Sequence, residues 1–158
     1  MMFDKNLNLI TTHSIVLLPV FDGDMKSKVL TKDGYLFSTF TPIQLLRNAC
    51  IRNGSTLEGR IDAANELLGY SKKLPLYIGD GIYAFPTRSP YHPECIWVFY
   101  HNFQYWSYSK GQTMLQFEND ETIVLDISLH TFITQKQRLA SIILSLGFNK
   151  QQKLIRRK

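Results

Sequence analysis

The chain of 158 residues is long enough for one ordinary globular domain and too short for two independent hydrophobic cores. Hydrophobic residues make up 44% of it and charged residues 20%, which excludes an intrinsically disordered protein. Its apolar stretches are far shorter than the roughly 18 residues of a membrane-spanning helix, and its first residues lack a signal-peptide pattern. Because only Cys50 and Cys95 are present, a disulfide scaffold is excluded, and we expect reduced thiols in a cytoplasmic protein with no membrane partner.

The net charge of +5 is concentrated at the C-terminal end of the chain. Residues 150–158 include five basic residues and no acidic residue, so the rest of the chain has 13 basic and 13 acidic residues. We therefore expect a main domain over residues 1–149 and a basic tail over residues 150–158. Such a tail suits a polyanion such as nucleic acid, and a solvated, frayed end is the alternative interpretation.

Segments rich in β-branched and aromatic residues predict most of the chain to be strand. Two strand segments come first, at residues 14–20 and 26–40, and Asp33-Gly34 supplies a two-residue hairpin turn inside the second. The second half adds further strand-like runs that are broken by Gly, Asn and Asp: residues 74–86, 95–109, 113–118 and 121–129.

Three helices are predicted from capping residues and apolar periodicity. The first covers Pro42–Ile51 with Thr41 as its cap, and the second covers Leu57–Leu68, with Ser55 or Thr56 as its cap, and stops at Gly69. The third runs from about Thr131 to Leu146 and is expected to end at Gly147. Together these elements predict an α+β fold: a single domain with a mostly antiparallel β-sheet, two short helices in the first half and a C-terminal helix.

Neither a metal site nor a catalytic site is supported by the residue pattern. His92 and Cys95 have the spacing of half a zinc site, which Cys50 and His101 could complete, but the missing second pair favours buried free thiols. No Gly-x-Ser-x-Gly is present, and the carboxylates of residues 118–121 lie in what resembles a solvated turn. The Gly-Asp-Gly at residues 79–81 lacks the helix that a nucleotide-binding loop requires. We expect no metal, no cofactor and no enzyme activity.

Seven aromatic residues crowd the segment between residues 97 and 108. They could form a base-stacking platform for single-stranded nucleic acid, or the core of a sheet. Strand alternation places Trp97 and Phe99 on one side and Val98 and Tyr100 on the other, so apolar groups occupy both faces. This pattern favours a core.

Residues 53–60 (NGSTLEGR) form the most informative segment of the sequence. A glycine turn, a hydroxyl cap such as Ser55 and a helix N-terminus offer backbone N–H groups to an anion, and Arg60 lies one turn inside the helix. The alternative is a capped helix whose Arg60 pairs with a nearby carboxylate. If the loops converge, three further cations supplement an anion site at this place: Lys72, Lys73 and Arg88.

The order and spacing of three segments resemble the ComK family, the competence transcription factors of Gram-positive bacteria. These segments are ACIRNGSTLEGR, KKLPLYIGDGIYAFPTRSP and PECIWV. The positions that match the family pattern are Cys50, Gly54-Ser55 with Gly59-Arg60, Lys73 with Pro75, Phe85-Pro86-Thr87 with Ser89, and Cys95 with Trp97. The similarity extends over roughly residues 14–146 and is most specific between residues 50 and 97.

The resemblance implies a transcriptional activator that switches on genes for DNA uptake and recombination. It further implies an oligomer that binds paired AT-rich boxes mainly through the minor groove, where narrow, negative A-tracts favour Arg and Lys. RNA polymerase and an adaptor of a Clp-type protease are the other implied partners. This chain ends in LGFNKQQKLIRRK, where related proteins continue further, so the adaptor is the least supported of these partners.

Pattern and resemblance together predict the contacts with double-stranded DNA. We expect a contact patch on the main domain (Arg60, Lys72, Lys73 and Arg88), a phosphate held by Ser55 with neighbouring amides, and unspecific attraction from the tail (Lys150, Lys153, Arg156 and Arg157). The alternative is a regulatory protein-interaction module of the same fold, whose weak DNA affinity comes from the tail. Deletion of residues 150–158 distinguishes the two, because specific binding survives it only in the activator. Oligomeric state, box spacing and strand order stay open.

Overall fold

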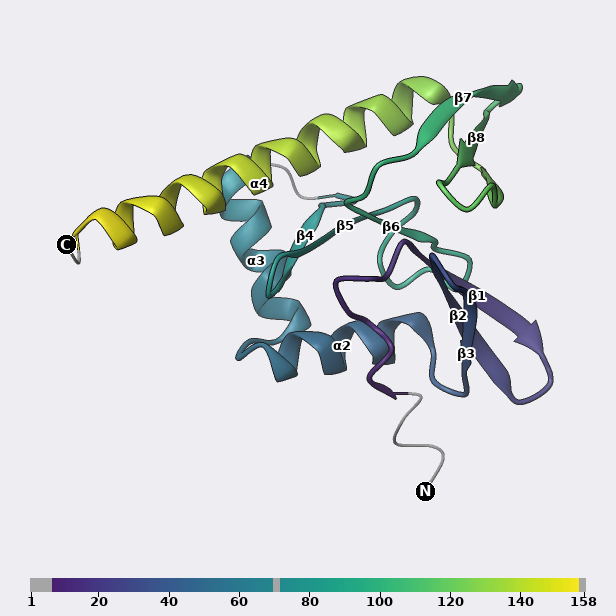
Figure 1. The fold of residues 1–158 in the computed structure, drawn as a ribbon, viewed down its shortest axis with the longest axis horizontal. Helices are drawn as coiled ribbons and strands as arrows, with labels where there is room; N and C mark the ends of the chain where they lie inside the picture. Colours follow the sequence, from purple (N-terminus) through teal and green to yellow (C-terminus); the bar gives the residue numbers. More distant parts are fainter. Residues whose placement is uncertain (1–6, 70–71, 157–158) are drawn as a thin grey trace.

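The structure is a computed structural model that describes residues 7–69 and 72–156, with side chains placed through residue 146. Within these residues, nine strands form two antiparallel sheets, and three helices pack around them (Figure 1). The predicted α+β class, with two helices in the first half and one at the C-terminal end, is confirmed. No helix in this part of the chain is both long enough and apolar enough to cross a bilayer.

The larger sheet has six strands in the order β3-β2-β1-β6-β5-β4, and all its neighbours are antiparallel. Its elements are β1 (Val16–Asp22), β2 (Met25–Thr31), β3 (Gly34–Ser38), β4 (Leu76–Gly79), β5 (Ile82–Pro86) and β6 (Trp97–Phe99). Strand β1 pairs with β6 across a long sequence separation, so the N-terminal β-meander and the β4-β5 hairpin form one continuous sheet.

The turn between β2 and β3 lies one residue earlier than predicted. Thr31 pairs with Gly34, so the two loop residues are Lys32 and Asp33 rather than Asp33 and Gly34. The hydroxyl of Thr31 accepts the Asp33 N–H and donates to the Gly34 carbonyl, which fixes this register. Gly34 supplies a positive φ of 111° at the first residue of β3, and this requirement explains why glycine follows the turn.

A smaller sheet holds three strands in the order β7-β8-β9: β7 (Gln104–Ser109), β8 (Gln112–Gln116) and β9 (Thr122–Leu125). The expectation that the aromatic segment forms a core is correct for Trp97 and Phe99, which are buried in β6. It is wrong for Trp106 and Tyr108, which are 40% and 57% exposed, because β7 is an edge strand whose six residues are all exposed. Strand β6 ends at Phe99, so the alternation used for the prediction does not continue into β7.

The two short helices have the predicted boundaries because their caps are specific. Helix α2 (Pro42–Arg52) begins with a capping box between Thr41 and Gln44. Helix α3 (Leu57–Leu68) begins at the cap Thr56 and ends at Gly69, whose φ of 72° completes a left-handed C-cap. Both helices cover one face of the larger sheet.

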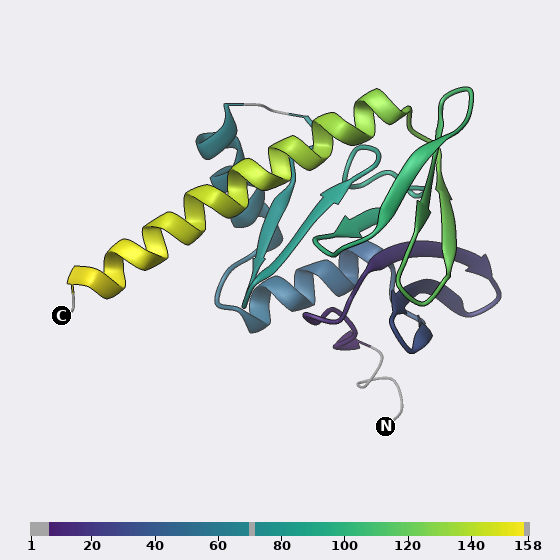
Figure 2. The same ribbon diagram turned by 45° about the horizontal axis from the view of Figure 1, so that its top comes forward.

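Helix α4 (Leu129–Arg156) is longer than predicted and does not end at Gly147. A glycine inside a helix costs about 1 kcal/mol relative to alanine, which is too little to stop a helix that continues into Lys, Gln and Leu with no proline. In Figures 1 and 2, α4 begins beside the β7-β8 hairpin, crosses α3 and β4, and extends beyond the rest of the chain. The segment 150–156 is therefore part of this helix.

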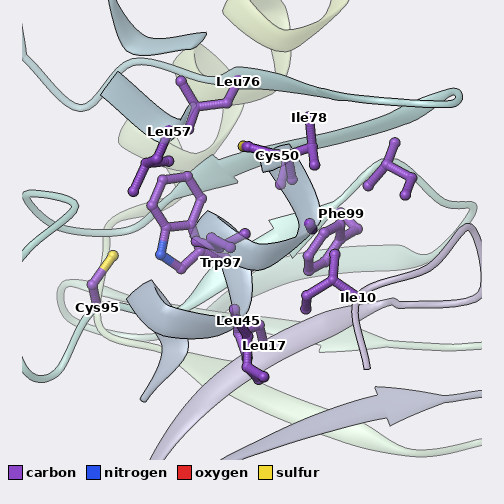
Figure 3. Packing of buried hydrophobic residues seen from close by; sticks show 14 of the residues in the cluster. Ile10, Leu17, Leu45, Cys50, Leu57, Leu76, Ile78, Cys95, Trp97 and Phe99 are labelled. Atoms are coloured by element: carbon purple, nitrogen blue, oxygen red, sulfur yellow. The ribbon is translucent and has the colours of Figure 1, made fainter. Parts of the chain in front are cut away.

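The core has two layers, one on each face of the larger sheet. Figure 3 shows the first layer gathered around Trp97, where residues of α2 and α3 such as Cys50 and Leu57 meet β4 and β6. In the second layer, Phe85 and Val98 pack against the smaller sheet and against Phe132 of α4. Helix α4 contributes to both layers and thereby fixes the place of its own first turns relative to the α3-β4 loop.

Candidate nucleic-acid interface

The loop before α3 uses much of its hydrogen-bonding capacity within the chain. Thr56 is the helix cap, and its hydroxyl accepts the Gly59 N–H at 2.9 Å. The Ser55 N–H donates to the Cys50 carbonyl, and the Ser55 hydroxyl makes a long contact of 3.4 Å with the carbonyl of Thr56. Ser55 is half-buried, so a phosphate at this place would contact its hydroxyl rather than its amide.

Arg60 is anchored to the body of the domain. Its guanidinium lies 4.9 Å from the ring centroid of Tyr77, and Nη2 donates to the carbonyl of Asn53 at 3.4 Å. The neighbouring carboxylate of Glu58 pairs instead with Arg47 at 2.9 Å. The backbone N–H of Glu58 itself, and then Arg47, lower the pKa of this carboxyl group. The anchoring partners of Arg60 are therefore a ring and a carbonyl.

Arg88 lies in the loop after β5 with two carboxylates beside it. Its Nη2 is 3.6 Å from Asp126 and 3.8 Å from Glu94, and its side chain is 36% exposed. The two acids compensate its charge locally, so Arg88 contributes little net positive potential to a surface.

Lys72 and Lys73 are exposed in the loop between α3 and β4. They line a groove of about 600 Å³ together with residues of the first turns of α4, and none of the described residues that line it is a carboxylate. The described residues that line it are Gly69, Lys72, Lys73, His130, Thr131, Thr134, Gln135 and Arg138. The structure therefore groups Lys72 and Lys73 with each other, whereas Arg60 and Arg88 line other parts of the surface.

Sequence reasoning missed His130 and Arg138 as candidate binding residues. Positions 130, 134 and 138 are spaced four residues apart in a segment predicted to be helical from residue 131, so they share one helix face. This periodicity was a usable signal for a polar, cationic stripe. The contact of the neighbouring Gln135 with the α3-β4 loop is a long-range feature that no local pattern encodes.

The predicted tail contacts lie at the far end of α4. Lys150, Lys153 and Arg156 belong to the last turns of this helix, and Arg157 lies outside the described residues.

Both cysteines are free thiols buried in the domain. Burial raises the pKa of Cys50 and of Cys95, and the Cys95 thiol also contacts the carbonyl of Arg88 at 3.6 Å. In the part of the chain that the structure describes, no three His, Cys, Asp or Glu residues gather as metal ligands would.

The fold and this arrangement of cations define a small, single-domain α+β protein with a basic groove. A family model described as "ComK protein" matches residues 5–153, and the chain belongs to this family, which confirms the resemblance seen in the sequence. The chain is similar to the protein named "Competence transcription factor" of Bacillus subtilis (strain 168). The two are 30% identical over 131 residues, which cover 80% of this chain and 68% of that protein. No solved structure matches the chain.

Proposed function

We propose that this protein is a competence transcription factor that acts by binding double-stranded DNA in the cytoplasm. The observation that carries the proposal is the family match over residues 5–153, together with the similarity to the Bacillus protein named "Competence transcription factor". The groove with Lys72 and Lys73 supports it, because a cluster of cations without acids favours the phosphate backbone. Nothing in the proposal requires an enzymatic step.

The proposed target is a pair of AT-rich boxes, contacted mainly through the minor groove. Helix α3 is poorly suited to enter a major groove, because Glu58, Asp62 and Glu66 are exposed along it and would repel phosphates. Minor-groove binding needs no such helix: Arg and Lys are attracted by the negative potential of narrow A-tracts. Lys72, Lys73 and Arg88 lie in loops, where they can reach a groove.

The proposed contacts fall into two groups. Lys72 and Lys73 would contact phosphates directly, since both are exposed and neither belongs to an ion pair of the described residues. Ser55, Arg60 and Arg88 would have to exchange or extend their intramolecular contacts, and we propose them as supplementary contacts. The cations of residues 150–158 would add attraction that does not depend on DNA sequence.

The pairing of the proposed DNA boxes also bears on the oligomeric state of the protein. Two copies related by a twofold axis would place equivalent surfaces on the two boxes, so we propose a homo-oligomer as the DNA-bound form. As an activator it would also contact RNA polymerase, and a Clp-protease adaptor is a further proposed partner.

The experiment that tests the function is a binding titration of the purified chain at two salt concentrations. It compares a duplex with paired A/T tracts against a GC-rich duplex of equal length. We expect tighter binding to the A/T duplex, and we expect this preference to persist at the higher salt concentration. Equal and salt-labile binding to both duplexes would contradict the proposal and would favour a regulatory module with tail-driven affinity.

A further inference from the structure

The groove between the α3-β4 loop and α4 combines charge with a built framework. Two of its walls carry cations: Lys72 and Lys73 on the loop, and Arg138 on the helix. His130 adds imidazole N–H capacity, and two threonine hydroxyls complete a lining that is rich in hydrogen-bond donors. A cavity of this composition can surround a tetrahedral anion with several donors at once.

Gln135 holds the two walls of the groove together. Its side chain is only 2% exposed, and its Nε2 donates to the carbonyl of Lys73 at 2.9 Å and to that of Pro86 at 2.8 Å. Its Oε1 accepts a long hydrogen bond of 3.4 Å from Nη1 of Arg138, which also lines the groove. Lys73 itself has a φ of 52°, a conformation that costs free energy in a non-glycine residue and that the Gln135 contact helps to maintain.

The electrostatic setting of this groove differs from that of Arg47 and Arg88. Arg47 and Arg88 each have a carboxylate within 4 Å, so their charges are largely compensated. In contrast, none of the described residues that line the groove is acidic, and the ion pairs of the described residues leave out Lys72 and Lys73. Among the described residues, the positive charges of Lys72 and Lys73 are therefore less compensated than those of Arg47 and Arg88.

We propose that this groove is the binding site for a phosphate group of the DNA backbone, with His130 and Arg138 as contact residues beside Lys72 and Lys73. Gln135 is a positioning residue, because it acts through the loop and through Arg138. The inference rests on the proposed DNA-binding function and assigns it a place: one strand of the duplex passes over the first turns of α4. His130 and Thr131 of the first turn of α4 line the groove, so the positive end of the helix dipole lies near it and adds to the attraction.

The test uses the full chain and exposed positions, so that the variants fold. Lys72→Gln combined with Lys73→Gln is compared with a control of equal charge, Lys26→Gln combined with Lys110→Gln, whose side chains are exposed away from the groove. The readout is the slope of log affinity against log salt for the A/T duplex. We expect the groove variant to lose about 0.9 in slope for one phosphate contact, which corresponds to about eightfold in affinity at 0.1 M salt. The control should keep the wild-type slope.

A second variant and a second probe separate the possible failures. His130→Gln, also at an exposed position, should weaken duplex binding without lowering the melting temperature. Inorganic phosphate, added at constant ionic strength, should shift the amide resonances of Thr131 and Thr134 in wild-type protein. If phosphate shifts them but the groove variant keeps the wild-type salt slope, the groove holds free phosphate and the inference is overturned. If the wild-type chain binds no duplex, the proposed function fails; if it binds and both groove variants bind equally well, only the groove assignment fails.

Discussion

Replacement of Gly79 by alanine is expected to destabilise the domain strongly. Gly79 ends β4 with a φ of 140°, and a Cβ at this position would lie 2.8 Å from Oδ1 of Asn53 and closer still to its Cβ and Cγ. Asn53 is the C-cap of α2, and its carbonyl accepts a hydrogen bond from Arg60, so the close approach of the Asn53 side chain to the Gly79 backbone lies beside the start of α3.

The size of the effect follows from two contributions. An L-residue with this φ costs about 1–3 kcal/mol, and forcing the side chain of Asn53 aside costs about another 1–3 kcal/mol. Gly81→Ala is the matched control, since its φ is 76° and nothing lies within 4 Å of the added Cβ, so only the backbone cost applies. In a domain of this length, a loss of 1 kcal/mol lowers the melting temperature by about 2–4 °C.

Urea denaturation followed by circular dichroism measures both variants. Gly79→Ala should lose about 2–6 kcal/mol, and Gly81→Ala about 1–3 kcal/mol. Asn53→Gly combined with Gly79→Ala should recover part of the difference, because it removes the side chain that the new methyl group meets. Equal stabilities of Gly79→Ala and Gly81→Ala would refute the reasoning, since the close packing of β4 on α2 would then have no energetic consequence.

Three further predictions concern a buried amide, the thiols and the long helix. Gln135→Leu leaves the backbone carbonyls of Lys73 and Pro86 without their donor. The free energy of unfolding, measured in urea, should therefore fall by about 2–4 kcal/mol, and a loss below 1 kcal/mol would contradict the assigned hydrogen bonds. Burial raises the pKa of Cys50 and Cys95 in the folded state. The free energy of unfolding therefore falls as the pH rises above about 8.5, the ordinary pKa of a thiol, because the unfolded chain then loses protons that the folded chain keeps. Unfolding measured between pH 8 and 10 should therefore depend less on pH after both cysteines are replaced by alanine, and an unchanged slope would show that the thiols do not ionise on unfolding. Gly147→Ala should raise stability by about 0.5–1 kcal/mol because the residue lies inside α4, and a lower melting temperature would indicate that the helix ends there.

Local signals in the sequence were sufficient to predict the helices whose ends are capped. Thr41 and Thr56 begin their helices as predicted, and Gly69 ends the second, because each requirement is met within a few residues of sequence. The predicted positions of the β2-β3 turn and of the end of α4 were less accurate, because at each place the prediction relied on the position of a glycine. The glycine after Asp33 follows the turn instead of forming it, and Gly147 lies within a helix whose later residues favour continuation.

The candidate site depended on contacts that a local pattern cannot encode. Lys72 and Lys73 were identified by charge, but the helix that faces them is about 60 residues away and is joined to them through Gln135. The same limit explains the aromatic segment. Burial of Trp97 follows from its place in the larger sheet, whereas Trp106 belongs to the edge strand of a second sheet. The segments around Trp97 and Trp106 are equally rich in aromatic residues, and only the sheet topology shows which of the two is buried.

Recognition through the minor groove can be tested with three duplexes that differ only in the paired tracts: A·T, G·C and inosine·cytosine. The inosine·cytosine pair presents the minor groove of A·T, because it lacks the amino group of guanine, while it keeps a major groove similar to that of G·C. We predict that the chain binds the inosine·cytosine duplex about as tightly as the A·T duplex and more tightly than the G·C duplex. Binding of the inosine·cytosine duplex at the level of the G·C duplex would contradict recognition through the minor groove, and equal binding of all three would contradict sequence-selective recognition altogether.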